Sequence, residues 1–277
     1  MSTPDILLTL AKAAKVRVEK RLHEHSLTAL RAMATERLAE ERTRTPERLG
    51  AFERALRAPG LSVIAECKRA SPSKGLIAPE FPYVEIARDY EAGGAAAISV
   101  LTEPTQFLGS DRYLEEISHA VATPLLRKDF IVHEAMIYGA KAMGASAVLL
   151  IVSILTPAQL ADYLQLVESL GMSALVEVHD EKEVEVALAA RARIVGVNHR
   201  NLRTFSVDTT LAERFRGLVP SDVVYVAESG VTSVEDAVHQ YQSGADAVLI
   251  GEALMRTSDK VGFLCEIAKK TREEAVR

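Results

Sequence analysis

The sequence predicts an α/β protein with the fold of a (βα)8 TIM barrel, preceded by an N-terminal helical extension. Two observations predict this fold. After residue 60, short runs rich in Val, Ile, Leu and Ala alternate with charged stretches of helical period, which is typical of a parallel sheet. In addition, a glycine followed by small residues and a strand start recurs at 94–98, 144–148 and 244–248. Because glycine readily ends a helix in a left-handed conformation, this repeat indicates a recurring helix-to-strand turn.

Residues 1–57 differ from the rest of the chain and predict a pair or trio of amphipathic helices. Apolar side chains recur there at helical spacing, at Ile6, Leu7, Leu10, Ala14, Val18 and Leu22. Charged residues dominate from Lys12 to Arg57, and the segment ends near Pro59-Gly60. A detached coiled-coil arm would need a more regular apolar repeat. We therefore expect these helices to pack on the barrel.

Eight short strands are expected in the barrel. They lie at residues 62–67, 95–101, 124–128, 146–152, 174–178, 193–197, 223–227 and 246–250. An open dinucleotide-binding sheet would also alternate strands with helices, but no G-x-G-x-x-G follows the first strand. Eight strands with a recurring turn favour the closed barrel. We expect a single domain, with residues 1–60 as the extension and 61–277 as the barrel.

Net charge and cysteine content predict a cytoplasmic globular protein. The net charge is -5 and the sequence pI about 5.9, so no global basic field attracts nucleic acid or a membrane surface. The two cysteines, Cys67 and Cys265, match no metal-ligand spacing and make a disulfide framework implausible. The N-terminus lacks the pattern of a secretory signal, and the apolar run 145–155 is too short to cross a bilayer.

Charged and amide side chains occupy the carboxyl ends of the strands, although strands buried on both faces should be apolar. These residues are Glu66, Lys68, Lys128, Glu177, Asn198, Arg200 and Glu228. The carboxyl ends of barrel strands converge on one mouth, where barrel enzymes hold their catalytic groups. Three cations would face three carboxylates there and neutralise one another, yet remain available for general acid–base chemistry. A structural ring of ion pairs is the alternative.

Small residues after the last two strands predict a phosphate site. Ser229-Gly230 follows the seventh strand and Gly251-Glu252 the eighth, where loops of this fold commonly hold phosphate. Glycine lets backbone N–H groups approach an anion closely, although a plain left-handed turn is the alternative interpretation. Thr232 and Glu235 are expected to form a capping box for the next helix. The long, basic first βα loop, residues 69–75, is either a mobile lid with anion ligands or a solvated surface loop.

Residues 64–75, IAECKRASPSKG, closely resemble the first-strand motif of indole-3-glycerol-phosphate synthases, written I-A-E-x-K-x-x-S-P-S-x-G. Further segments that resemble this family lie at 99–103, 126–131, 148–151, 175–179, 196–202, 226–230 and 249–251. The resemblance covers essentially the whole chain. It implies a carboxy-lyase of tryptophan biosynthesis that converts 1-(2-carboxyphenylamino)-1-deoxyribulose 5-phosphate to indole-3-glycerol phosphate, with release of CO2 and water.

The resemblance implies catalytic roles at the mouth. Lys128 would be the general acid that protonates the ribulose carbonyl, with Lys68 as a rival acid in one step. Glu177 would assist proton removal at the anilino nitrogen or during dehydration. The remaining groups would support them, Glu66, Lys68 and Glu228 as an ion network and Asn198 and Arg200 by orienting the intermediate.

The resemblance also implies binding roles. Ser71 would bind near the substrate carboxylate. The phosphate would be held by Lys68 and by the main chain of Ser229, Gly230, Gly251 and Glu252. An apolar pocket for the anthranilate ring would be lined by Phe107, Phe130, Leu149 and Leu202. Because decarboxylation restores aromaticity, neither a cofactor nor a metal is implied, and the seven histidines are expected to have structural or solvent roles.

One position departs from the family and three alternatives remain open. His199 stands where Asn or Ser is expected, but strand alternation points it away from the mouth. Another phosphate-binding barrel, such as phosphoribosylanthranilate isomerase or the tryptophan synthase α subunit, would not require Glu66 and Lys68 together with Lys128. Class I aldolase chemistry would instead make Lys128 a Schiff base. A non-catalytic metabolite-binding barrel would not need so many ionisable groups. Other tryptophan-pathway enzymes are possible partners.

Overall fold

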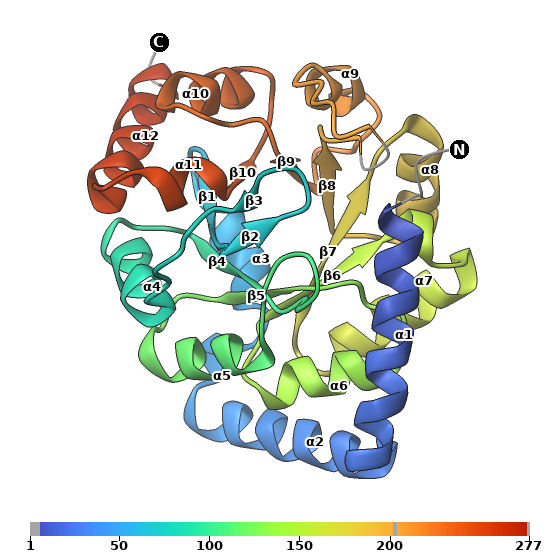
Figure 1. The fold of residues 1–277 in the computed structure, drawn as a ribbon. Helices are drawn as coiled ribbons and strands as arrows, with labels where there is room; N and C mark the ends of the chain where they lie inside the picture. Colours follow the sequence, from blue (N-terminus) through green and yellow to red (C-terminus); the bar gives the residue numbers. More distant parts are fainter. Residues whose placement is uncertain (1–5, 202–203, 276–277) are drawn as a thin grey trace.

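The computed structural model describes residues 6–201 and 204–275, and eight parallel strands form a closed barrel at its centre (Figure 1). The strands are β1 (Ser62–Cys67), β4 (Ala97–Leu101), β5 (Leu125–Lys128), β6 (Ala147–Ile151), β7 (Ser173–Val178), β8 (Ile194–Asn198), β9 (Val224–Glu228) and β10 (Ala247–Ile250). Each strand pairs with its neighbours in chain order, and β10 closes the barrel on β1. All eight expected ranges overlap an observed strand, so the predicted barrel is confirmed.

Helices surround the barrel and connect its strands. They are α4 (Tyr83–Ala92), α5 (Asp111–Ala120), α6 (Glu134–Ala142), α7 (Pro157–Ser169), α8 (Glu181–Ala189), α9 (Leu211–Arg216), α10 (Val234–Gln242), α11 (Glu252–Arg256) and α12 (Lys260–Ala275). Gly94, Gly144 and Gly244, the first residues of the repeated turn, have φ values of 79°, 88° and 91°. Residues with a side chain rarely adopt these angles, which explains the recurrence of glycine. No helix in the described ranges is long and apolar enough to span a bilayer.

The N-terminal extension packs on the barrel. It consists of α1 (Ile6–Glu24), α2 (Leu27–Arg44), the 3-10 turn η1 (Pro46–Arg48) and α3 (Ala51–Leu56). In Figure 1, α2 lies beside α6, and α1 runs along the outside of the barrel, with its first residues near the mouth. The short α3 contacts β1 and β4 and buries Phe52 and Leu56. The helices are therefore not a detached arm, as expected from their irregular apolar repeat.

The capping box before α10 lies one residue later than predicted. The N-cap is Ser233, whose hydroxyl accepts from the amide of Asp236, and the side chain of Asp236 accepts the amide of Ser233. The amide and hydroxyl of Thr232 also donate to Asp236. The expected pair of Thr232 and Glu235 is therefore wrong. Ser233, not Thr232, is the N-cap, and the Asp236 carboxylate accepts the backbone amides of both Thr232 and Ser233.

The first βα loop is more ordered than a plain loop. It forms a small antiparallel hairpin of β2 (Ala70–Ser71) and β3 (Gly75–Leu76). Gly75 has a φ of 64°, and the amide of Lys74 donates to the carbonyl of Ser71 at 3.3 Å, which closes the turn. The backbone of Arg69 also accepts the amides of Ile77 and Ala78. The hairpin places its basic tip beside the barrel mouth.

Candidate active site

The carboxyl ends of the strands surround a cavity of about 630 Å³. Of the residues predicted for the site, those that line it are Glu66, Lys68, Ser71, Phe107, Lys128, Phe130, Leu149, Glu177, Asn198, Arg200, Glu228, Ser229, Gly230, Gly251 and Glu252. Leu202 lies outside the described residues. Residues from both ends of the barrel sequence thus meet in one cavity, as the barrel topology requires.

The central charged and amide groups occupy the ends of their strands: Lys128, Asn198 and Glu228 are the last residues of β5, β8 and β9, and Glu177 is the last but one of β7. Leu101 pairs with Lys128, Ile151 with Glu177, and Asn198 with Glu228. Side chains alternate along a strand, so residues of the same parity point into the barrel. The last inward position of each strand therefore lies at the mouth, and lysine, glutamate or asparagine occupies it in β5, β7, β8 and β9.

Lys128 stands between two carboxylates. Its Nζ lies 3.0 Å from Glu177 Oε2 and 3.1 Å from Glu228 Oε2, and all three side chains are nearly buried. Burial alone would lower the pKa of Lys128, but the charges of Glu177, Glu228 and Glu66 hold this pKa well above its ordinary value. Lys128 is therefore a fully protonated ammonium group that faces the cavity.

Glu177 is held by three neighbours. Besides Lys128, Asn198 Nδ2 donates to its Oε1 at 3.1 Å, and His179 Nε2 lies 3.3 Å from the same oxygen. Burial tends to raise the pKa of Glu177, but Lys128, His179 and Asn198 together bring it far below its ordinary value. Glu177 is thus an ionised carboxylate that accepts hydrogen bonds from Lys128 and Asn198 and lies within ion-pair distance of His179.

His179 belongs to this cluster, whereas structural or solvent roles are expected for the histidines from the sequence. Its second ring nitrogen, Nδ1, lies 3.1 Å from Glu183 Oε2. Burial would lower the pKa of His179, but Glu177 and Glu183 raise it to about 10, so the ring is an imidazolium at neutral pH. The signal that could have found it was its parity, because His179 follows Glu177 by two residues and shares its side.

Glu228 is the mouth carboxylate with an unsatisfied atom. Its Oε1 is buried and has no hydrogen-bond partner among the described residues. Burial, and the charges of Glu177 and Glu66, raise the pKa of Glu228 to about 7 despite the opposing effect of Lys128. A group with this pKa can both accept and donate a proton near neutrality. Gly196 makes room for it, since a Cβ at that position would lie 2.2 Å from Oε1.

The raised pKa of Glu228 predicts a specific dependence of stability on pH. Between pH 4.5 and 7 the folded chain keeps a proton that the unfolded chain has lost, so this carboxyl lowers stability as pH rises. Glu228→Gln cannot ionise and lacks the effect. We expect the free energy of unfolding of the wild type, relative to Glu228→Gln, to fall by about 3 kcal/mol across this range. Denaturant titrations at several pH values measure it, and a constant difference would contradict the assignment.

Glu66 and Lys68 form a second ion pair at the mouth. Lys68 Nζ lies 2.5 Å from Glu66 Oε2. Gly251, at the end of β10, leaves the space that the pair occupies: a Cβ there would lie 2.2 Å from Glu66 Oε2 and 2.5 Å from Lys68 Nζ. The glycine thus supports the ion pair by its lack of a side chain.

Gly251→Ala is expected to damage activity more than stability. Gly251 has a negative φ, and the atoms that would clash are the ends of flexible side chains, which can move. We expect the free energy of unfolding to change by about 1 kcal/mol or less and kcat/KM to fall about 10- to 100-fold, because the Glu66–Lys68 pair is displaced. Gly217→Ala is the matched control, since nothing lies within 4 Å of its Cβ position. Equal activity of the two variants would show that the displaced pair is dispensable.

Three cations were expected to pair with three carboxylates at the mouth, but only the two lysines, Lys68 and Lys128, form these ion pairs. The described residues contain no ion pair between Arg200 and Glu66, Glu177 or Glu228. Instead, Arg200 Nη1 donates to the carbonyl of Phe205 at 3.4 Å. The reason is that Arg200 lies two residues beyond β8, in a bridge with Val207, where strand alternation no longer directs its side chain.

The loops after β9 and β10 present free backbone donors. Ser229 and Gly230 have φ values of 68° and 84°. Among the described residues, the amides of Gly230 and Gly251 donate to no carbonyl or side chain. The Ser229 hydroxyl donates to Asn198 Oδ1 at 2.9 Å, which ties this loop to β8. Backbone donors beside Lys68 suit an anion such as a phosphate group.

An apolar compartment occupies the other side of the cavity. Phe107 and Phe130 lie with ring centroids 6.4 Å apart, tilted by 41°, next to the buried Leu149. Three residues of α1 also line the cavity, Ile6, Leu7 and Leu10. Their helical spacing predicts an apolar face but does not connect that face with the site. The helical spacing of apolar residues predicts that one face of a helix is buried, but it does not predict which surface that face packs against.

Comparisons with known proteins agree with this geometry. A family model described as "Indole-3-glycerol phosphate synthase" matches residues 7–267. The chain is 48% identical over 262 residues to an indole-3-glycerol phosphate synthase of Ruminiclostridium cellulolyticum, which covers 95% of this chain and 98% of that protein. It is 46% identical over 269 residues to an indole-3-glycerol phosphate synthase of Endomicrobium trichonymphae, and the match covers 97% of this chain and 98% of that protein. The solved structure of a thiamine phosphate pyrophosphorylase from Pyrococcus furiosus matches with a TM-score of 0.58 at 18% identity, over 78% of this chain and 98% of that chain, which shows the fold alone.

Proposed function

The chain belongs to the indole-3-glycerol phosphate synthase family, and from that premise we propose how its mouth residues share the reaction. The family reaction converts 1-(2-carboxyphenylamino)-1-deoxyribulose 5-phosphate to indole-3-glycerol phosphate, with ring closure, loss of CO2 and loss of water. This carboxy-lyase reaction, a step of tryptophan biosynthesis, is the activity of the chain. It acts on a phosphorylated small molecule.

Lys128 is the general acid of ring closure in this proposal. The observation that carries it is the position of Nζ about 3 Å from both Glu177 and Glu228, because these carboxylates keep the ammonium protonated and aimed at the cavity. As the ring carbon attacks the substrate carbonyl, negative charge develops on the carbonyl oxygen, and a positioned ammonium can neutralise it by donating a proton. Lys68, paired with Glu66, is the second candidate for an acid in a later step.

Two carboxylates remain for proton removal. Glu177 assists removal at the anilino nitrogen or during dehydration, and His179 and Asn198 hold its Oε1 in place. Glu228, with a pKa near 7 and one free buried oxygen, is suited to exchange protons with Lys128 between steps. A group whose pKa lies near the working pH makes an efficient acid–base catalyst.

The substrate is held at its two ends in this proposal. The free amides of Gly230 and Gly251, with those of Ser229 and Glu252 and the ammonium of Lys68, bind the phosphate. At the opposite end Phe107, Phe130 and Leu149, with Leu202, enclose the aromatic ring, and Ser71 binds near its carboxylate. Burying one ring face of roughly 100 Å² contributes about 2–3 kcal/mol to binding. Asn198 and Arg200 orient the ribulose portion between the two ends.

The N-terminal extension belongs to the same functional unit as the barrel in this proposal. Residues 1–60 and the barrel act as one domain, because α1 contributes cavity-lining residues that the barrel alone lacks. The composition and the family's biosynthetic role favour the cytoplasm. Neighbouring tryptophan-pathway enzymes that supply the substrate or consume the product are the proposed partners.

The proposed function is tested by incubating the purified chain with the carboxyphenylamino substrate and following indole fluorescence. The sequence contains no tryptophan, so the chain contributes no indole fluorescence of its own to the signal of the product. We expect product to form without added metal and equally well in the presence of a chelator. No rise in indole fluorescence would reject the function, and a loss on chelation would reject the absence of a metal.

A separate experiment distinguishes acid catalysis from aldolase chemistry at Lys128. A Schiff base between Lys128 and the substrate carbonyl would be reduced by borohydride to a stable adduct. We expect none, because the two carboxylates keep Lys128 protonated and a protonated amine is not a nucleophile. Mass spectrometry of the treated chain is the measurement, and an adduct on the peptide containing Lys128 would overturn the proposed role.

A further inference from the structure

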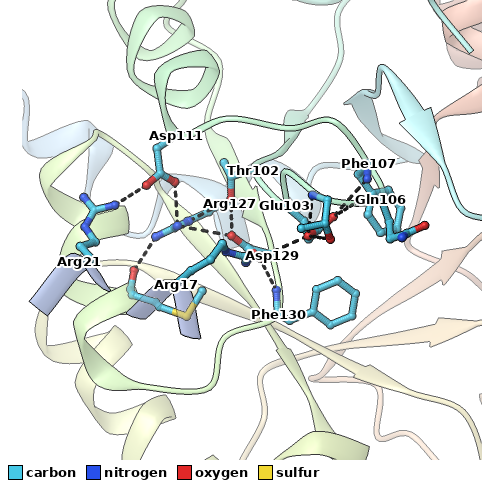
Figure 2. Close-up of polar contacts among 12 residues, drawn as sticks. Arg17, Arg21, Thr102, Glu103, Gln106, Phe107, Asp111, Arg127, Asp129 and Phe130 are labelled. Carbon is cyan, nitrogen blue, oxygen red and sulfur yellow. Dashed lines mark hydrogen bonds and ion pairs between the residues drawn. The ribbon is translucent and has the colours of Figure 1, made fainter. Parts of the chain in front are cut away.

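Arg17, on α1, joins the N-terminal extension to two loops at the barrel mouth (Figure 2). Its guanidinium lies 3.1 Å from Glu103 Oε1 and 2.5 Å from Asp129 Oδ1. Glu103 follows β4 and Asp129 follows β5, and both carboxylates are almost completely buried. The planar fork of an arginine allows one side chain to contact two carboxylates at once. None of the roles proposed above uses these contacts.

Each carboxylate also holds the backbone that carries one aromatic ring of the apolar compartment. Glu103 Oε2 accepts the amide of Phe107 at 3.1 Å. Asp129 Oδ1, the oxygen that Arg17 contacts, also accepts the amide of Phe130 at 2.8 Å. The two rings lie side by side at the cavity. The Arg17 guanidinium therefore contacts both of the carboxylates that accept the backbone amides of Phe107 and Phe130.

Arg17 supplies the positive charge beside Glu103. Among the described residues, Arg17 is the only cation within ion-pair distance of Glu103, whereas Asp129 also lies 3.5 Å from Arg127. Burial tends to raise the pKa of Glu103, but hydrogen bonds, chiefly from Thr105, bring it below the ordinary value, so the group is ionised at neutral pH. Removing Arg17 leaves this buried carboxylate with its hydrogen bonds but with no cation at ion-pair distance in the described part of the chain, and the loop that contains it is then expected to shift.

The helix face that carries Arg17 is also the face that lines the cavity. Leu7 and Leu10 line it, and Ala14 is buried next along the same stripe before Arg17. These spacings of three, four and three residues keep one side of a helix. The loops after β4 and β5 thus carry the two rings of the compartment, and Arg17 connects both loops to α1.

We propose that Arg17 is the positioning residue of the compartment that binds the substrate's aromatic ring, an inference that rests on the proposed function. It does not line the cavity itself. It acts through Glu103 and Asp129, which set where Phe107 and Phe130 stand. The N-terminal extension therefore takes part in ring recognition by a charge contact as well as by its apolar side chains.

The test compares Arg17→Met with Arg21→Met. Arg21 lies one turn further along α1, is similarly exposed, and pairs with Asp111, which does not hold either ring (Figure 2). We expect Arg17→Met to lower kcat/KM about 30-fold, mainly through KM, and Arg21→Met to stay within about threefold of the wild type. Arg17→Lys keeps the charge without the fork and is expected to recover to within about fivefold. Thermal unfolding of each variant separates a loss of fold from a loss of positioning.

A double-mutant cycle with Phe107→Leu shows whether Arg17 acts through the ring. If Phe107→Leu alone lowers kcat/KM about tenfold, independent effects would multiply to about 300-fold in the double variant. We expect the double variant Arg17→Met/Phe107→Leu to lose only about 30-fold in kcat/KM, because Arg17 can no longer position a ring that has been removed. For Arg21→Met combined with Phe107→Leu, we expect the two losses in kcat/KM simply to multiply. If Arg17→Met does not fold, Arg17→Lys enters the same cycle. Multiplication with the Arg17 variant, or kcat/KM within threefold of the wild type, would overturn the inference.

Binding of anthranilate, followed by its own fluorescence, provides a readout that needs no turnover. We expect Arg17→Met to weaken this binding about tenfold and Arg21→Met to leave it unchanged. A wild type that bound anthranilate but formed no indole would reject the proposed function and leave the positioning role testable. Equal binding by the two variants, with an active wild type, would reject the positioning role alone.

Discussion

Replacing Lys128 with methionine is expected to lower kcat by about 10³-fold or more, while substrate binding changes by about tenfold or less. Methionine keeps most of the length of the side chain but removes the proton that stabilises the developing charge on the carbonyl oxygen. A positioned acid contributes about 10²–10⁴ in rate, and the electrostatic contribution of the ammonium adds to it. Single-turnover kinetics with the indole fluorescence assay measure the chemical step directly.

Lys128→Arg is the informative companion of this variant. Arginine keeps a positive charge near Glu177 and Glu228, but its pKa is too high for it to give up a proton. Comparable losses in the methionine and arginine variants would identify proton transfer as the essential contribution, whereas recovery in the arginine variant would identify charge. Near-normal kcat in both variants would remove Lys128 from the mechanism. Thermal unfolding of each variant checks that the fold survives.

The second large effect is expected from Glu177→Gln, which should lower kcat about 10²- to 10³-fold with the fold intact. The amide keeps the shape of the side chain but can neither accept a proton nor pair with Lys128 and His179. The same change removes the main partner that raises the pKa of His179. We therefore also expect that pKa to fall from about 10 toward the ordinary value of 6.5. NMR titration of the ring follows it.

Glu183→Gln is the matched control for this prediction. Glu183 contacts the other nitrogen of His179 and does not line the cavity, so its loss loosens His179 without touching Glu177. We expect kcat to remain within about threefold to fivefold of the wild type. Wild-type activity in Glu177→Gln would show that the carboxylate is only structural. A loss in Glu183→Gln as large as in Glu177→Gln would move the essential function to His179.

Sequence patterns predicted the parts of the site that lie on strands. Glu66, Lys128, Glu177 and Glu228 could be placed together because alternation fixes the side of each residue and the closed barrel fixes where the sides meet. The glycine repeat predicted the turns, because a positive φ is a local property of the chain. These predictions needed only the spacing of residues along the sequence.

Errors began where the chain leaves regular structure. Arg200 was expected among the ion pairs of the mouth, but it follows β8 in a loop whose backbone turns it to the carbonyl of Phe205. The capping box was placed one residue early, because Thr232 and Ser233 can both serve as caps and only the backbone selects between them. In both cases the residue type was correct, and the local geometry decided its partner.

The sequence by itself determined the barrel, its helical extension and the set of side chains that face the mouth, since all of these follow from periods of two and 3.6 residues. Only the tertiary structure decided which charges pair, that Glu228 titrates near neutrality while Glu177 stays ionised, and that Arg17 reaches two loops of the barrel. The physical reason is that the energy of a buried charge depends on neighbours about 3 Å away. Those neighbours come from different strands, at distances that no pattern along the chain specifies.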